Sequence, residues 1–119
     1  MNTQQAGQPW RLAVGTETVG DIFVVTVAGE IDYQTGGPLR QALNLPDDVP
    51  PRVVVDLRQV PFIDSSGINL FITAHHTLAG ADGWLRLAGA VPPVLRTIKL
   101  VGIDQLVECH PTVEQALGR

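Results

Sequence analysis

Apolar positions along the chain recur at a spacing of two residues in some segments and of three to four in others, which predicts strands alternating with helices. Strands are expected at residues 10–19, 22–28, 53–57, 84–88 and 105–108. Helices are expected from the cap Thr35 through Leu45 and at 66–79, 92–100 and 113–117. A turn signal at Gly20 and Asp21 predicts that the first two strands form a hairpin. The second strand is almost wholly apolar, as expected for a central strand that is covered on both faces.

The order of these segments predicts an α/β fold. Strands that alternate with helices of this length form right-handed crossovers, so the sheet should be mostly parallel. The hairpin adds an antiparallel edge at the N-terminal side, and about four helices cover the sheet. We expect one domain over residues 10–119, preceded by a polar, flexible leader over residues 1–9. A proline-rich loop at 46–51 should end the first helix.

Composition excludes several classes of protein. The 119 residues carry a net charge of −4, with a single lysine and no basic cluster, so binding to nucleic acid or to an anionic membrane is not expected. Cys109 is the only cysteine, which rules out an intramolecular disulfide and fits a reducing compartment. Without a signal peptide pattern or a long apolar stretch, the expected location is the cytoplasm.

The sequence offers no enzyme signature. It has neither a Gly-x-x-x-x-Gly-Lys phosphate loop nor a Gly-x-Ser-x-Gly nucleophile elbow. His75 and His76 are neighbours on a predicted helix and should point to different faces, so they are not expected to share a metal with each other or with His110. We therefore expect no catalytic residues, no metal site and no cofactor.

The most informative segment is Asp64-Ser65-Ser66-Gly67, at the start of the second predicted helix. One interpretation is structural, because Asp and Ser side chains commonly cap helix N-termini. The other is functional, because a serine at the carboxyl edge of a parallel sheet is accessible to a partner. Free amides of the first turn should tolerate a phosphate there, while its charge beside Asp64 would repel a surface matched to a hydroxyl. Gly67 costs helix stability and suggests a close approach.

Longer motifs resemble the STAS family, and in particular bacterial anti-sigma factor antagonists. The resemblance spans about residues 10–117. It is carried by Gly-Glu-Ile-Asp at 29–32, VVVDL at 53–57, VPFIDSSGINLF at 60–71, WLRL at 84–87, and Val94-Leu95-Arg96 with Leu100, Gly102 and Ile103. In that family the first serine of the Asp-Ser-Ser-Gly element is phosphorylated by the anti-sigma factor, which is itself a kinase. The resemblance therefore implies that Ser65 is the phosphoacceptor.

The same resemblance implies a partner-binding surface. Asp32 matches a family acidic residue that faces a basic residue of the kinase, although Glu30 and Asp32 could equally form a solvated turn. Ser66, Gly67 and Asn69 join Asp64 and Ser65 in this surface by proximity. The chain departs from the family pattern at residues 46–51 and at Asn69, where a small or apolar residue is commoner.

Three hypotheses follow from these observations. In the first, the unphosphorylated protein binds an anti-sigma factor serine kinase and so releases a sigma factor. Phosphorylation of Ser65 then ends this binding, and a serine phosphatase removes the phosphate again. In the second, the chain is a constitutive STAS interaction module of a transporter or a stress-signalling complex. The third, a domain that binds a nucleotide or another small molecule, or even an enzyme, has only exposed helix N-termini in its favour. In each case a monomer or a weak dimer is expected.

Overall fold

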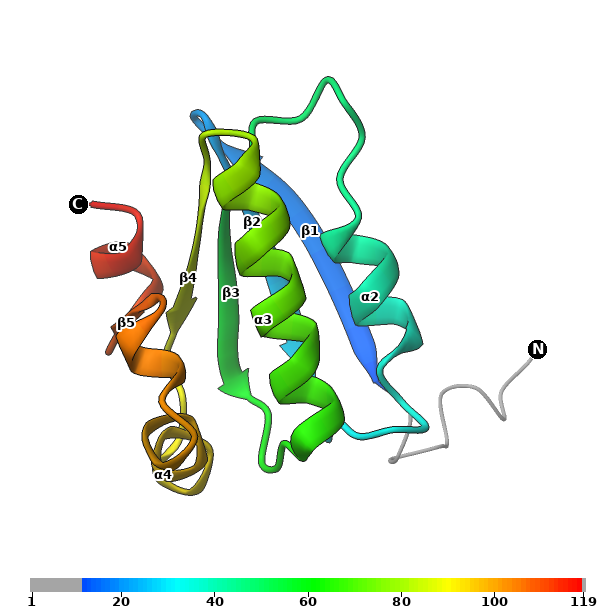
Figure 1. Ribbon diagram of the computed structural model, residues 1–119, viewed down its shortest axis with the longest axis vertical. Helices are drawn as coiled ribbons and strands as arrows, with labels where there is room; N and C mark the ends of the chain where they lie inside the picture. Colours follow the sequence, from blue (N-terminus) through cyan, green and yellow to red (C-terminus); the bar gives the residue numbers. More distant parts are fainter. Residues whose placement is uncertain (1–11, 119) are drawn as a thin grey trace.

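The computed structural model describes residues 12–118, which form one domain of a five-stranded mixed sheet and four α-helices (Figure 1). Along the chain the elements are β1 (Ala13–Val19), β2 (Ile22–Ala28), α2 (Gly37–Leu43), β3 (Arg52–Gln59), α3 (Ser65–Gly80), β4 (Trp84–Ala88), α4 (Pro92–Leu100), the 3-10 helix η1 (Ile103–Gln105), β5 (Glu108–His110) and α5 (Val113–Ala116). The strands lie in the order in which they occur in the sequence. Only β1 pairs antiparallel, with β2, so the predicted α/β class and edge hairpin are confirmed.

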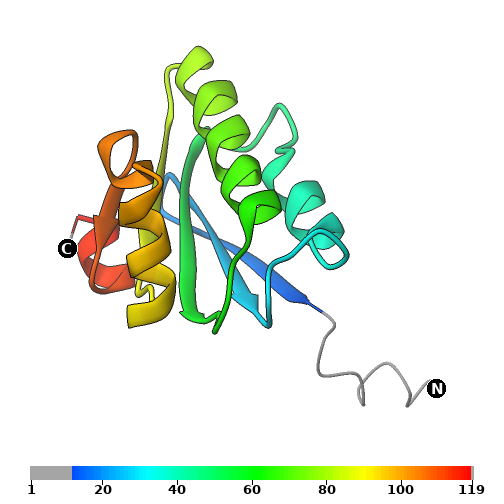
Figure 2. The ribbon, with the colours of Figure 1, turned by 60° about the horizontal axis from the view of Figure 1, so that its bottom comes forward.

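The sheet is buried on both faces along its middle strand, β3. Val53, Val55 and Leu57 face a large core that includes apolar side chains of α2, α3 and α4. Val54 faces the opposite side, where it packs in a smaller cluster with Ala116 of α5. Because successive strand residues point to opposite faces, a continuous apolar run such as Val53 to Val55 requires cover on both sides. Figure 2 shows α2 and α3 together on one side of the sheet.

One buried charge lies near the carboxyl end of β3. Asp56 is 3% exposed, and its carboxylate accepts hydrogen bonds from Nε and Nη2 of Arg58 at 3.1 and 2.8 Å. Arg58 passes over Gly89, where a Cβ atom would lie 2.4 Å from Cγ of the arginine. The glycine leaves space for the arginine side chain to reach the acid, which keeps the buried carboxylate paired.

Two predictions about element ends are wrong. Thr35 does not cap the first helix, because the N-cap is Gly36 and the Thr35 hydroxyl donates to the Glu30 carbonyl at 2.6 Å within the preceding loop. The last strand is Glu108–His110 rather than 105–108, because Gly102, at φ 82°, turns the chain into η1 first. The predicted leader and the start of the first strand, residues 10 and 11, lie outside the described residues.

The remaining elements agree with their predictions to within a few residues. The prolines Pro92 and Pro93 start α4, and the Thr112 side chain caps α5 by accepting from the Gln115 amide at 3.1 Å. Over residues 12–118, no helix combines the length and hydropathy that crossing a membrane requires.

Candidate functional site

Two loops meet at the carboxyl edge of the sheet, one after β2 and one after β3. Ile31 and Ile63 form an isolated parallel bridge between them. The Ile31 amide donates to the Phe62 carbonyl at 3.0 Å, and the Asp64 amide donates to the Ile31 carbonyl at 3.1 Å. Because β2 and β3 are parallel neighbours, their following loops leave the sheet at the same edge. This backbone bridge places Asp32 close to the start of α3.

Asp64 caps α3 and also binds the loop that follows β2. Its Oδ1 accepts hydrogen bonds from the amides of Ser66 at 2.8 Å and Gly67 at 3.3 Å. Its Oδ2 accepts a hydrogen bond from the Tyr33 amide at 3.3 Å. The structural interpretation of the motif therefore holds for Asp64. It does not hold for Ser65, which is the first residue of the helix and is exposed.

The Ser65 hydroxyl makes no hydrogen bond to any residue in the described part of the chain. The expectation that the first-turn amides are free is wrong for Ser66 and Gly67, which donate to Asp64, and for Ile68, which donates to the Asp64 carbonyl at 3.1 Å. Asp64 satisfies the donors that a helix N-terminus otherwise leaves open. A group attached to Ser65 would therefore lie beside the Asp64 carboxylate without those three donors.

Asp32 shapes the loop after β2. Its Oδ1 accepts hydrogen bonds from the amides of Gln34 and Thr35, each at 2.9 Å, in a side-chain-stabilised turn. Neither Asp32 nor the exposed Glu30 forms an ion pair within residues 12–118. Both interpretations from the sequence remain compatible with this geometry, because Asp32 builds the turn and still leaves its charge without a cation.

Gly67 is buried where α3 passes closest to both loops. A Cβ atom at this position would lie 2.6 Å from Cγ1 of Ile63 and 2.7 Å from Cγ2 of Ile31. The close approach that the sequence suggested is therefore confirmed, and the two isoleucines of the loop bridge are the side chains that need the space.

Comparison with known proteins identifies the family. A sequence model of the STAS domain matches residues 13–116. The chain belongs to the STAS domain family. An anti-sigma-B factor antagonist of Listeria monocytogenes is 32% identical over 90 residues, which cover 74% of this chain and 75% of that protein. The resemblance seen in the sequence motifs is thereby confirmed.

Solved structures agree with this assignment. The crystal structure of an anti-sigma factor antagonist from Mycobacterium paratuberculosis matches with a TM-score of 0.84 and 31% sequence identity. The alignment covers 93% of this chain and 95% of the Mycobacterium chain. The Bacillus antagonist SpoIIAA shares the fold, with TM-scores of 0.74 for its unphosphorylated form and 0.71 for its phosphorylated form. The unphosphorylated form is 22% identical to this chain and the phosphorylated form 21%. Both alignments cover 90% of this chain, and they cover 95% of the unphosphorylated and 98% of the phosphorylated SpoIIAA chain.

Within this STAS domain, the predicted site residues are brought together to different degrees. Asp32, Asp64, Ser65, Ser66 and Gly67 gather where the two loops meet α3, as the hydrogen bonds above show. Asn69 is exposed one turn further along the helix, and Ser66 and Asn69 line the same hollow on its surface. Glu30 contributes its carbonyl to the loop, while its side chain is exposed.

Sequence reasoning missed two aromatic residues beside this site. Tyr33 is 85% exposed and Phe62 is 49% exposed, although large apolar side chains usually lie inside a domain. Both are fixed by backbone bonds, the Tyr33 amide to Asp64 and the Phe62 carbonyl to Ile31. Their sequence signal was an aromatic residue directly after Asp32 and another two residues before Asp64.

The histidines do not build a second site. The rings of His75 and His76 lie 5.2 Å apart on α3, and Nε2 of His110 pairs with Glu108 on β5 at 2.8 Å. No group of three or more His, Cys, Asp and Glu side chains suited to a metal ion occurs among residues 12–118.

Proposed function

We propose that this STAS domain is an anti-sigma factor antagonist whose binding is switched off by phosphorylation of Ser65. In its unphosphorylated form it binds an anti-sigma factor that is a serine kinase, and the bound sigma factor is released. The observation that carries this proposal is the exposed Ser65 hydroxyl, which has no role in the helix cap because Asp64 performs it. The antagonists among its relatives give the partner class, and SpoIIAA has been solved in both phosphorylation states.

Electrostatics explain how a phosphate would end binding. A phosphoserine carries a charge of about −1.5 to −2 at neutral pH. It would lie beside Asp64, whose oxygens already occupy the nearest amides, and in the neighbourhood of the unpaired Asp32. A partner surface that receives a neutral hydroxyl together with these two carboxylates would then face a much larger negative charge in a desolvated interface.

The surroundings of Ser65 suit a protein partner. Tyr33 and Phe62 provide aromatic side chains of the kind that commonly anchor protein interfaces. Asp32 and Glu30 provide carboxylates for a basic residue of the kinase. The partner-binding set proposed from the sequence, Glu30, Asp32, Asp64, Ser65, Ser66, Gly67 and Asn69, is therefore extended by these two aromatic residues.

The chain is the substrate of the phosphoryl transfer rather than its catalyst. Ser65 Oγ forms a bond to the γ-phosphorus of ATP, the bond to the β–γ bridging oxygen breaks, and ADP leaves. The kinase supplies the nucleotide site and the group that accepts the hydroxyl proton. A separate serine phosphatase transfers the phosphoryl group to water and restores the hydroxyl. The protein needs no cofactor of its own, and the proposed setting of the cycle is the cytoplasm.

The test compares Ser65→Asp, Ser65→Ala and Thr18→Asp with wild type for binding to each purified anti-sigma factor kinase encoded in the same genome. Thr18→Asp is the matched control, because it adds the same charge at an exposed position on β1, outside the proposed partner-binding set. We expect wild type, Ser65→Ala and Thr18→Asp to bind. Ser65→Asp should bind at least about thirtyfold more weakly, since one unpaired charge in an interface costs about 2–5 kcal/mol. With ATP, the mass should rise by one phosphate unless Ser65 is replaced.

The opposite result favours the constitutive module. Equal binding of all four proteins, with no mass change under ATP, would mean that Ser65 is only a solvent-exposed helix residue. A stable complex with a transport or stress-signalling protein that ignores Ser65→Asp would then identify the chain as a permanent interaction domain.

A further inference from the structure

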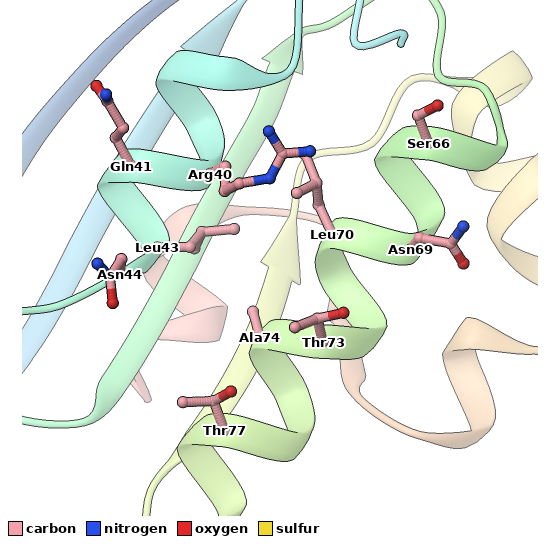
Figure 3. Close-up of a pocket in the computed structure, with 10 residues that line it drawn as sticks. All are labelled: Arg40, Gln41, Leu43, Asn44, Ser66, Asn69, Leu70, Thr73, Ala74 and Thr77. Carbon is pink, nitrogen blue, oxygen red and sulfur yellow. The ribbon is translucent and has the colours of Figure 1, made fainter.

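A groove runs between α2 and α3 on the face of the sheet that both helices cover. Its volume is about 620 Å³. Figure 3 shows Arg40 and Leu43 of α2 and Leu70 of α3 facing one another across it. We call it the α2–α3 groove. The residues that line it are Arg40, Gln41, Leu43, Asn44, Ser66, Asn69, Leu70, Thr73, Ala74 and Thr77.

The α3 side of the groove is unusually free of charge. Asn69, Thr73 and Thr77 follow each other at a spacing of four residues and are exposed, so they form one neutral stripe along the helix. The whole of α3, 16 residues long, contains no Asp, Glu, Lys or Arg. The solvent face of a surface helix ordinarily carries charged residues, whereas the centres of protein interfaces are depleted of them.

Among the described residues that line the groove, Arg40 of α2 is the only one with a charged side chain. This residue is exposed and forms no ion pair with any residue of the described segment. In Figure 3 its guanidinium group extends from α2 toward Leu70 of α3, across the groove. A lone arginine with its five donors at a neutral surface is complementary to a carboxylate of a partner.

The groove is continuous with the Ser65 site. Ser66 lines the groove and directly follows Ser65. At the same end, Leu70 reaches the loop that carries Asp32, because a Cβ atom at Gly36 would lie 3.2 Å from Cδ1 of Leu70 and 3.3 Å from the Asp32 carbonyl oxygen. A partner that covers Ser65 and Asp32 is therefore positioned to extend into the groove.

The lining favours a polypeptide over a small molecule. Small-molecule pockets are mostly apolar and aromatic and enclose their ligand. Here seven of the ten lining residues are polar and none is aromatic. Neutral hydroxyl and amide side chains beside a short apolar floor suit the side chains and backbone of another protein.

We propose that the α2–α3 groove is a second docking site for the kinase that phosphorylates Ser65, and that it receives a segment of that partner with an acidic side chain for Arg40. This inference rests on the proposed function and adds a contact that begins beside the phosphoacceptor and extends along the groove to Arg40 and Thr73. Its role is to hold the partner in place, so it sets the affinity and not the rate of phosphoryl transfer.

The test measures the affinity of the full chain for the kinase identified through Ser65, using Arg40→Glu and Thr73→Arg. Two controls carry the same kinds of change elsewhere: Arg96→Glu on α4 and Thr18→Arg on β1, both at exposed positions. We expect Kd to rise about tenfold or more for the groove variants, as for the loss of an interface charge pair. The controls should stay within about twofold, because isolated surface changes cost little.

Kinetics of Ser65 phosphorylation provide a second measurement on the same proteins. The groove variants should raise KM about tenfold and leave kcat within about twofold, because the contact lies away from the reacting atoms. Thermal unfolding of each variant confirms that the fold is retained.

Four results would overturn the inference. If the groove variants bind like wild type while Ser65→Asp does not bind, the kinase does not use the groove and the proposed function stands. If Arg96→Glu weakens binding as much as Arg40→Glu, the effect is one of net charge. If sedimentation shows that wild type self-associates and Arg40→Glu does not, the occupant is a second copy of this chain. Failure of wild type to bind any kinase would instead refute the proposed function, and the groove inference with it.

Discussion

Gly67 shows at the scale of one residue why the Asp-Ser-Ser-Gly element has its composition. The first turn of α3 passes so close to the Ile31–Ile63 bridge that only a hydrogen atom fits. A glycine in this turn lowers the intrinsic stability of the helix by about 1 kcal/mol relative to alanine. The close packing that the glycine permits offsets this loss, because it fixes the start of α3, and Ser65 with it, against both loops.

Replacing Gly67 with alanine should therefore destabilise the protein. Forcing a methyl group into a filled space costs about 1–3 kcal/mol, against a gain of about 1 kcal/mol in helix propensity. We expect a net loss of up to about 2 kcal/mol in the free energy of unfolding, measured by urea denaturation. Gly80→Ala is the control, because this glycine ends the same helix with no heavy atom within 4 Å of the added carbon. Equal effects of the two substitutions would contradict the packing argument.

Arg86 organises the C-terminal elements. Its guanidinium carbon lies 3.8 Å from the ring centroid of Trp84. Its Nη1 donates to the Ala116 carbonyl at 2.8 Å, and its Nε lies 3.3 Å from the Glu108 carboxylate. One side chain of β4 thus joins β5 to α5, a helix of only four residues that could not be stable alone.

Arg86→Met should release α5 while leaving the rest of the sheet intact. The loss of a charged hydrogen bond and of the stacking on Trp84 should lower the free energy of unfolding by about 1–3 kcal/mol. Hydrogen exchange should accelerate in residues 113–118 more than in α3. Arg96→Met, an exposed arginine on α4 without an ion pair in residues 12–118, is the matched control. Uniform acceleration over the whole chain would show that Arg86 acts on global stability alone.

The elements themselves could be predicted from sequence more fully than their boundaries. The periodicity of apolar residues was enough to predict the type and sequence of the strands and helices, because that periodicity reflects which side chains are buried. The pattern could not show that Thr35 bonds back to Glu30, or that η1 delays β5 until Glu108, because both depend on local hydrogen bonds and turns.

The candidate site was predictable only in part. Ser65 and Gly67 followed from the motif and its position at a helix start. That Asp64 takes the Ser66 and Gly67 amides depends on a side-chain torsion that no periodicity encodes. The α2–α3 groove was likewise hidden, because the packing of α2 beside α3 that brings Arg40 close to Leu70 is tertiary.

At the scale of the whole molecule, Glu108 links stability to pH. A hydrogen bond with His110 and the charge of Arg86 lower the pKa of the Glu108 carboxyl below its ordinary value. The folded state therefore favours the carboxylate more than the unfolded chain does. The contribution of this carboxylate to the free energy of unfolding is therefore complete above the ordinary pKa of about 4.3. It is lost as pH falls through the lower pKa of the folded state.

Glu108→Gln should consequently reduce the acid sensitivity of the fold. We expect the difference in free energy of unfolding between wild type and Glu108→Gln to shrink between about pH 6 and pH 3, because only wild type has this carboxylate to protonate. Urea denaturation of both proteins at several pH values measures it. Glu114→Gln, which replaces an exposed acid on α5 that makes no ion pair within the described residues, is the control. A difference that stays constant with pH would contradict the linkage.

The backbone bridge between Ile31 and Ile63 has a consequence for the speed of the proposed switch. It closes the two loops around α3 through main-chain bonds that do not involve the Ser65 side chain. Under the proposed function, adding or removing a phosphate should therefore leave these loops in place, and the change in partner affinity should follow the covalent step without a lag. The response time of the proposed circuit would then be set by the turnover of its kinase and phosphatase.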